Sequence, residues 1–380
     1  MNLSFDEQQE MMRKSFKRFL ENRFPVEKAR AFMEEKREYD RDLWKGIAEL
    51  GITAILVDEE YGGLGLTPID QLVIQEEAGR FLTPAPIKAN AIASSLLNSA
   101  ANATSYREVL QEICEGNKIC TLGMMESSGK WDEPSSTQVR EGSHHYILNG
   151  TKISVPFVAM CEYVVVLAQG EKGNADFYLV PIEQEGVSYR RLKTIDPTQP
   201  WYEITFKNVE LKKDAKLNNG EIPLIERALE LGAIFTCVET VGGMEQVLDL
   251  ASAYAKEREQ FGKPIGSFQA IKHKLADMLV GIEKTKALSY YAALEVVEQT
   301  ETKVMSMASA KVLSVGIYHS LVREGIQLFG GIGYTWEHDM HLYLRRSIVN
   351  QTEFGDVRTY RQKIKKVLDL DTSNLLVEMK

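Results

Sequence analysis

Three long runs of helical periodicity in the second half of the chain constrain its fold more than any other feature. They cover residues 222–257, 268–297 and 302–329. Apolar side chains in these runs recur every three or four residues, which is typical of helices packed at shallow angles in a four-helix bundle. Residues 342–349 and 357–368 predict one further helix or a pair of helices for that bundle.

The first 220 residues divide into two stretches with different periods. Residues 5–115 read as helices, whereas residues 119–217 contain short segments in which apolar side chains alternate with polar ones. Asn149-Gly150, between two such segments, predicts a hairpin with a two-residue turn. Closely spaced short strands are typical of a small β-barrel or sandwich. We therefore predict an α+β, mainly α fold with a helical N-terminal domain (1–116), a middle β domain (117–220) and a C-terminal four-helix bundle (221–380).

Charge and composition exclude several classes of protein. The 380 residues include 45 Lys and Arg against 54 Asp and Glu, a net charge of −9. A negatively charged chain without a basic stripe does not attract nucleic acids. The sequence contains no uncharged apolar run long enough for a membrane span and no secretory signal at its start. Four cysteines without metal or disulfide spacing predict a reduced, cytoplasmic protein.

Two motifs in the predicted bundle combine a cation or an amide with an aromatic ring and glycines. The first contains Arg258, Phe261 and Gly262, followed by Gln269, and the second contains Gln327, Phe329, Gly330 and Gly331. An arginine offers two donors to a pyrophosphate, and glycine lets a ligand approach the backbone. Each motif alone also fits a helix end at which arginine offsets the dipole. Together, on helices expected to pack, they predict a site for a cofactor with phosphates and a ring.

Other polar residues in the C-terminal region point less clearly to a site. His338 and His341 share one helical face, but the sequence offers no clear third ligand, and we predict no metal site. Glu353 lies in a polar loop after the basic pair Arg345-Arg346. A buried carboxylate beside a cofactor can abstract a proton, whereas an ordinary loop acid is exposed to solvent. Both interpretations of Glu353 stay open at this point.

The whole chain resembles the acyl-CoA dehydrogenase family of flavoproteins, most closely over residues 258–278 and 327–345. The resemblance implies an FAD cofactor, an acyl-CoA substrate, α,β-dehydrogenation of its thioester and transfer of electrons to an electron-transfer flavoprotein. It also implies a homodimer, a homotetramer or a heteromer with a homologous subunit. The motifs of the bundle would then contact the ADP half of an FAD held mainly by a neighbouring subunit. The cofactor-binding residues predicted in this way are Arg258, Phe261, Gln269, Gln327, Phe329, Gly330, Gly331 and Ser154.

The same resemblance places no glutamate where the family keeps its catalytic base. Family members carry this base at one of two positions, which align with Phe354 and Gly232 here, and Glu353 lies one residue away from the first. The segments that ordinarily hold the flavin ring also depart from the family, at residues 125–132 and 154–156.

Three hypotheses follow from these departures. The chain is a complete dehydrogenase that uses Glu353 or another acid as a displaced base, or a non-catalytic or half-catalytic subunit that completes the FAD site of a homologous partner. A flavin-dependent oxidase or monooxygenase on the same scaffold is the third, because it needs no base at the two family positions.

Overall fold

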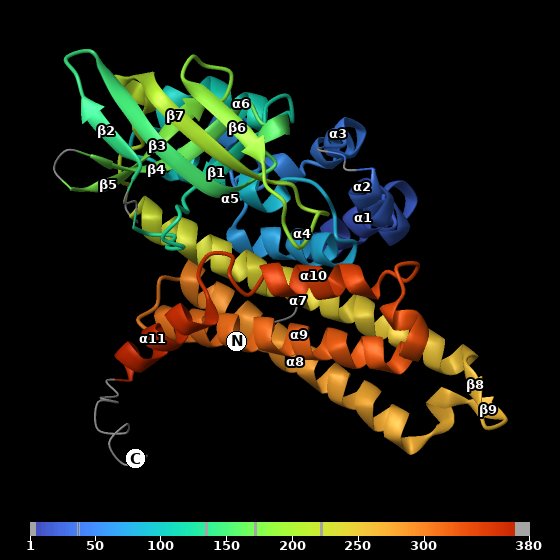
Figure 1. Ribbon diagram of the computed structural model, residues 1–380. Coiled ribbons are helices and arrows are strands. Elements are labelled where there is room, and N and C mark those ends of the chain that lie inside the picture. Colours follow the sequence, from blue (N-terminus) through green and yellow to red (C-terminus); the bar gives the residue numbers. More distant parts are fainter. Residues whose placement is uncertain are drawn as a thin grey trace, which may run out of the picture.

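The computed structural model describes residues 5–35, 37, 39–133, 136–170, 173–220 and 223–368. Figure 1 shows a curved sheet on one side, a bundle of long helices on the other, and the N-terminal helices packed against both. The predicted fold class, mainly α with one β region between two helical regions, is confirmed. The exact domain boundaries stay a prediction.

The N-terminal region consists of helices around a central, buried one. The helices are α1 (Glu7–Arg23), α2 (Val26–Glu34), α3 (Arg41–Glu49), α4 (Pro68–Arg80), α5 (Ile87–Ser99) and α6 (Arg107–Cys114). Helix α4 begins with a capping box in which Thr67 and Asp70 satisfy each other's backbone N–H groups. Almost every side chain of α4 and α5 is buried, so these helices form the layer that joins the sheet to the bundle.

The middle region is a single curled sheet. Its strands are β1 (Cys120–Gly123), β2 (Gln138–Glu141), β3 (His145–Pro156), β4 (Tyr163–Gly170), β5 (Ala175–Pro181), β6 (Val187–Arg191) and β7 (Trp201–Lys212). They follow the order β1-β4-β2-β3-β7-β6, and β5 also pairs with β4. Strand β4 is parallel to β1 and β2, while the other pairs are antiparallel. A strand with three partners requires the sheet to bend around it.

The predicted hairpin at Asn149-Gly150 was wrong. Both residues lie within the continuous strand β3, at a register shift in its pairing with β7 between Leu148 and Gly150. Gly150 has φ +145°, and a Cβ atom there would lie 2.4 Å from the Cα of Thr137. A glycine is needed here because the backbone of Thr137 comes close and the strand carries a bulge. Turns favour glycine as well, so the sequence alone does not distinguish the two structures.

The C-terminal region confirms the predicted helical runs. Its helices are α7 (Leu224–Glu257), α8 (Gln269–Val297), α9 (Lys303–Phe329), α10 (Met340–Val349) and α11 (Val357–Val367). A two-stranded ribbon, β8 (Glu259–Gln260) and β9 (Lys263–Pro264), connects α7 to α8 at the far end of the molecule (Figure 1). In the part of the chain that the structure describes, no helix is both long and apolar enough to cross a lipid bilayer.

Glycines allow α4 and α7 to pack backbone to backbone. A Cβ atom at Gly242 would lie 1.7 Å from the carbonyl oxygen of Glu76, and one at Gly79 would lie 2.1 Å from that of Glu239. No larger residue fits at either position without separating the helices. This contact brings the charged side chains of α4, α5 and α7 into the interior of the molecule.

Candidate functional site

A small cavity lies where the sheet, α5 and the loop before α11 meet. Its volume is about 30 Å³, which is room for about two water molecules and far below the roughly 300–1,000 Å³ of ordinary ligand pockets. Its walls are mainly apolar and aromatic, with two charged side chains, Lys88 and Glu353. Ser154, a predicted cofactor residue, adopts φ +52° in β3, two residues before Pro156 of the cavity wall.

The aromatic ring of Phe354 fills the place that the resemblance assigns to a catalytic base. Phe354 is buried and stacks on Trp131 with a centroid separation of 4.7 Å. The indole N–H of Trp131 donates to the carbonyl of Thr352 at 3.1 Å, which fixes the ring in this position. A Cβ atom at Gly232 would lie 2.2 Å from Cδ1 of Phe354. Both aligned base positions therefore belong to one apolar contact, and neither offers a proton acceptor.

Glu353 is not an exposed loop acid. Its side chain is 5 % exposed, and Oε2 lies 2.6 Å from Nζ of Lys88 and 3.5 Å from the hydroxyl of Thr236. Its backbone carbonyl accepts a hydrogen bond of 2.8 Å from Nζ of Lys311. The burial that a catalytic base requires is present, but the carboxylate is already engaged by an ammonium group.

The ion pair of Glu353 is the end of a buried chain of charges. Lys88 also lies 2.6 Å from Glu239 of α7, whose other oxygen lies 2.5 Å from Arg346 of α10. Arg346 in turn pairs at 2.6 Å with Asp196, in the loop between β6 and β7. Burial alone would raise the pKa of Glu239, but Lys88 and Arg346 outweigh it and lower the pKa to about 2. Buried side chains of alternating charge thus link the N-terminal helices, the β region and the bundle through ion pairs.

This chain of charges predicts a specific loss of stability in acid. The pKa of Glu239 is lower in the folded state than its ordinary 4.5, so its contribution is complete above that value and lost as the pH falls towards 2. We expect the difference in free energy of unfolding between the wild type and Glu239→Gln to shrink from pH 6 to pH 3, measured by urea titration. A control, Glu49→Gln on an exposed surface, should show no such change. If the difference in free energy of unfolding between the wild type and Glu239→Gln did not change with pH, the lowered pKa of Glu239 would be contradicted.

The two predicted motifs of the bundle meet at its far end. Tyr254, near the end of α7, packs on Phe329 at the end of α9 with a centroid distance of 4.5 Å, and its hydroxyl donates to the Phe329 carbonyl at 3.4 Å. Arg258 follows within one helical turn, and Gly330 and Gly331 come directly after Phe329. The structure therefore places side by side two segments that are about seventy residues apart in sequence.

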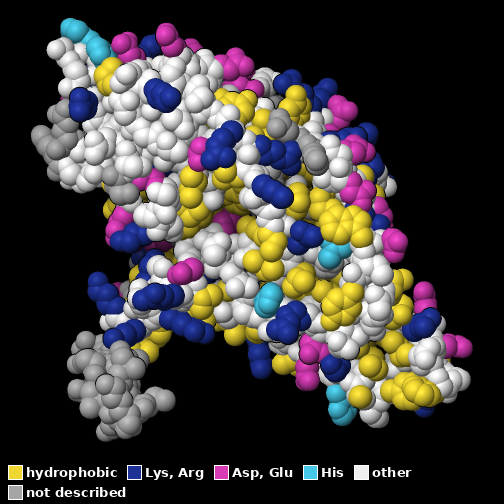
Figure 2. Space-filling view, viewed as in Figure 1, with side chains coloured by type: hydrophobic (Ala, Val, Ile, Leu, Met, Phe, Trp, Pro, Cys, Tyr) yellow, Lys and Arg dark blue, Asp and Glu magenta, His cyan; other side chains and the backbone are white. Residues whose placement is uncertain are grey.

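Most of these motif residues point to solvent. Arg258, Gln269 and Gln327 are exposed, and Phe261 is 92 % exposed with φ +53°. A Cβ atom at Gly330 or Gly331 would meet nothing within 4 Å. Figure 2 shows hydrophobic side chains gathered over this end of the molecule. This exposed surface fits the site predicted for a cofactor with phosphates and a ring, and the site stays a prediction.

Phe329 differs from the other predicted cofactor residues. Its ring is buried between Tyr254 and His338, whose ring centroid lies 4.1 Å away. Its packing holds the end of α9 in place before Gly330 and Gly331. Because Tyr254 and His338 already cover the ring, it is not available to stack on a cofactor. His341 stacks on Trp336 at 4.6 Å.

Comparison with known proteins agrees with this architecture. Residues 220–368 match the model of the acyl-CoA dehydrogenase C-terminal domain, and residues 6–117 match that of the N-terminal domain. The chain is 30% identical over 345 residues to the acyl-CoA dehydrogenase IpdE2 of Mycobacterium tuberculosis, covering 90% of this chain and 91% of that protein. The chain belongs to the acyl-CoA dehydrogenase family.

Solved structures of this family have the same fold. Butyryl-CoA dehydrogenase from Megasphaera elsdenii superposes with a TM-score of 0.89 at 23% identity, over 97% of this chain and 100% of that one. A chain of the ChsE4-ChsE5 complex from Mycobacterium tuberculosis gives 0.89 at 21% identity, over 98% of this chain and 100% of that one.

FAD is the cofactor of the family. The far end of the bundle fits this cofactor better than the cavity beside Ser154 does. The exposed arginine, amides and glycines at the far end of the bundle suit the phosphates and adenosine of a dinucleotide. The cavity beside Ser154, by contrast, has no room for a flavin ring while Trp131 and Phe354 are stacked in it.

Sequence reasoning missed Lys88, Glu239 and Lys311. Each is a single charged residue within an otherwise apolar helical run, and all three are buried. A charge on the apolar side of a helix was the available signal, because such a residue needs a partner inside the protein.

Proposed function

We propose that this chain is the non-catalytic subunit of a heteromeric acyl-CoA dehydrogenase. The cavity filled by Phe354 and Trp131 against Gly232 carries the proposal, because it leaves neither a base nor space for a flavin ring and a thioester. Arg258, Phe261 and Gln327 would then serve an FAD whose ring is held by a homologous partner. The structural neighbour from Mycobacterium tuberculosis is a complex of ChsE4 with ChsE5, and this pairing of two chains supports the proposed arrangement.

The partner would carry out the chemistry. A glutamate of the partner would serve as the base towards the α-proton of an acyl-CoA thioester. FAD would supply the oxidant for the α,β-dehydrogenation, with an electron-transfer flavoprotein as the electron acceptor. This chain would contribute phosphate contacts and a surface that excludes water from the adenosine half of the cofactor. Its closed cavity predicts one FAD for each pair of unlike chains.

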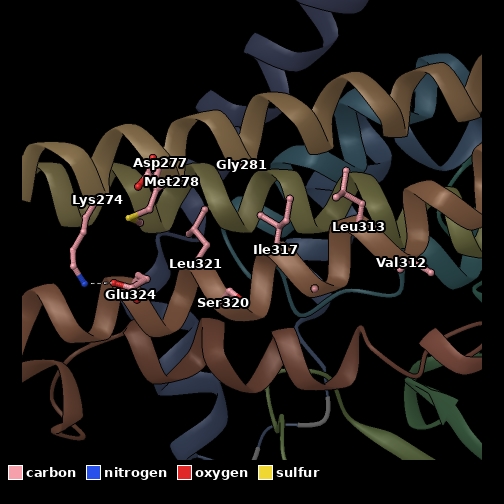
Figure 3. Close-up of a pocket in the computed structure, with 11 residues that line it drawn as sticks. Lys274, Asp277, Met278, Gly281, Val312, Leu313, Ile317, Ser320, Leu321 and Glu324 are labelled. Carbon is pink, nitrogen blue, oxygen red and sulfur yellow. Dashed lines mark hydrogen bonds and ion pairs between the residues drawn. The ribbon is translucent and has the colours of Figure 1, made fainter. Parts of the chain in front are cut away.

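An apolar groove offers a surface on which such a partner can pack. It runs between α8 and α9 (Figure 3), has a volume of about 810 Å³ and is lined by Met278, Val312, Ile317 and Leu321. An apolar groove open to solvent is one of the surfaces that mark protein–protein interaction sites.

The proposal predicts the flavin content of the protein. Purified alone, the chain should be colourless, because neither half of its surface encloses a whole FAD. Co-expressed with a homologous chain that has glutamate at the position of Phe354 or Gly232, it should yield a yellow complex with one FAD per two chains, measured by absorbance. That complex should bleach with an acyl-CoA.

A complete enzyme is the second candidate, because Glu353 lines the cavity. In that case the chain alone would be yellow with one FAD per chain, and Glu353→Gln would abolish flavin reduction while FAD stays bound. An oxidase or monooxygenase would also be yellow alone, but Glu353→Gln would leave its oxygen consumption unchanged. Either result would overturn the non-catalytic assignment.

A further inference from the structure

The apolar groove between α8 and α9 owes part of its depth to two glycines. A Cβ atom at Gly316 of α9 would meet nothing within 4 Å, and one at Gly281 of α8 would lie 3.1 Å from Cγ2 of Ile317. Larger residues at these two positions would therefore fill part of the groove. Its volume of about 810 Å³ lies within the range of pockets that enclose a ligand.

The two ends of this groove differ in charge. Lys274 of α8 pairs with Glu324 of α9 across one end (Figure 3). Val312 and Leu313 line the other end, which lies nearer the start of α9, and the adjacent lining residue Gly316 is uncharged as well. An apolar segment would therefore enter the groove at the end formed by Val312.

The start of α11 is fixed close to this entrance. Lys311, the residue of α9 just before the groove lining begins, donates to the backbone carbonyls of Asn350 at 2.9 Å and Glu353 at 2.8 Å. Helix α11 begins a few residues later and packs against α9 (Figure 1). Val367 and Leu368, where the described part of the chain ends, are about half exposed. The chain thus continues from a helix that is itself packed on α9.

Residues 369–380 lie outside the described residues, and their sequence has two parts. The part 369–374 is polar except for Leu370, whereas 375–379 contains four apolar residues, namely Leu375, Leu376, Val377 and Met379. A chain of six extended residues spans about 20 Å, and α11, with 11 residues, is about 16 Å long. The polar part is therefore long enough to bring Leu375 back to the level of Lys311 and the entrance of the groove.

We propose that residues 375–379 of this chain occupy the groove between α8 and α9. Leucine and methionine side chains would then leave water for the apolar walls at Ile317 and Leu321. A tether gives such a segment an effective concentration of about millimolar, so it covers the groove of the free chain before a second molecule does. The inference does not depend on the flavin site, and a homologous partner that packs on this groove has to displace the segment.

The test measures how accessible the groove is in the full chain. Val312→Cys places a thiol at the entrance, and the four native cysteines are buried. N-ethylmaleimide should modify Val312→Cys at least about tenfold more slowly in the otherwise native chain than in a chain that also carries Leu375→Ser and Leu376→Ser, because the two leucines then no longer favour the groove. Mass spectrometry follows the reaction.

Two controls make the result specific. Leu370→Ser lies in the part that only spans the distance, and it should keep the slow reaction of Val312→Cys. Lys45→Cys, at an exposed position on α3, should react at the same rate with and without the two leucine substitutions.

Equal rates for Val312→Cys in the native background and with Leu375→Ser and Leu376→Ser would overturn the inference. A slow reaction that becomes fast on dilution of the protein would assign the cover to a second copy of the chain and would overturn it as well. The flavin content of the complex with a homologous partner tests the proposed function separately, so the failure of one proposal is distinguishable from the failure of the other.

Discussion

Replacing Lys88 by methionine should destabilise the chain by about 3–5 kcal/mol, the ordinary loss when one partner of a buried ion pair is removed. Lys88 lies 2.6 Å from both Glu239 and Glu353, and all three side chains are buried. Without the ammonium, two carboxylates would face each other in the interior. The free energy of unfolding from urea titration at pH 7 measures the loss.

Two further variants make this result specific. Lys45→Met should change the free energy of unfolding by less than about 0.5 kcal/mol, because Lys45 and its partner Glu49 are mostly exposed and 4.0 Å apart. Lys88→Met combined with Glu353→Gln should be more stable than Lys88→Met alone, since only Glu239 then needs a cation and Arg346 supplies one. A loss below about 1 kcal/mol for Lys88→Met would show that the buried chain of charges is unimportant to stability.

Replacing Arg258 by glutamine should raise the dissociation constant of FAD in the complex with the partner about 10- to 100-fold. The reason is the loss of a charged hydrogen bond to phosphate, which is worth about 1.5–3 kcal/mol. Arg258 forms no ion pair within the described part of the chain, so the substitution leaves no acid unpaired. Retention of flavin absorbance through dilution and ultrafiltration is the measurement.

The control for this experiment is Arg361→Gln. Arg361 is exposed on α11, and Figure 1 shows α11 at the opposite end of the helical bundle from β8, the strand that directly follows Arg258. It should leave FAD retention unchanged. If Arg258→Gln retained FAD as well as the wild type does, the far end of the bundle would not be part of the flavin site. The proposal that Arg258 contributes to the FAD site of a partner subunit would then be wrong.

The elements of this fold followed largely from local pattern. Helices α7, α8 and α9 lie within a few residues of the runs predicted from apolar periodicity. The turn at Asn149-Gly150 failed because a bulge and a turn select the same residues, and only the contact with Thr137 distinguishes them. The pairing of β4 with three strands is likewise a long-range property.

The candidate site was predictable on one side only. Arg258 and Gln327 stand in conspicuous motifs, and Tyr254 and Phe329 bring these motifs together. Glu353 was singled out from its loop as a candidate base, and that role stays a prediction. Its partner Lys88 lies 265 residues away in sequence. A local sequence pattern does not indicate contacts between residues so far apart in the chain. The burial of Glu353 could therefore not be inferred from the sequence.

By itself, the sequence determined the family, the helical periods and the absence of a glutamate at the positions of Phe354 and Gly232, because these depend on residue type and spacing. Only the tertiary structure decided what surrounds those two positions. It packs Phe354 on Trp131 and pairs Glu353 with Lys88, while Arg258 and Phe261 at the far end of the bundle stay exposed. The physical reason is that space and unpaired charge arise from contacts between segments distant in the chain, and periodicity carries no information about them.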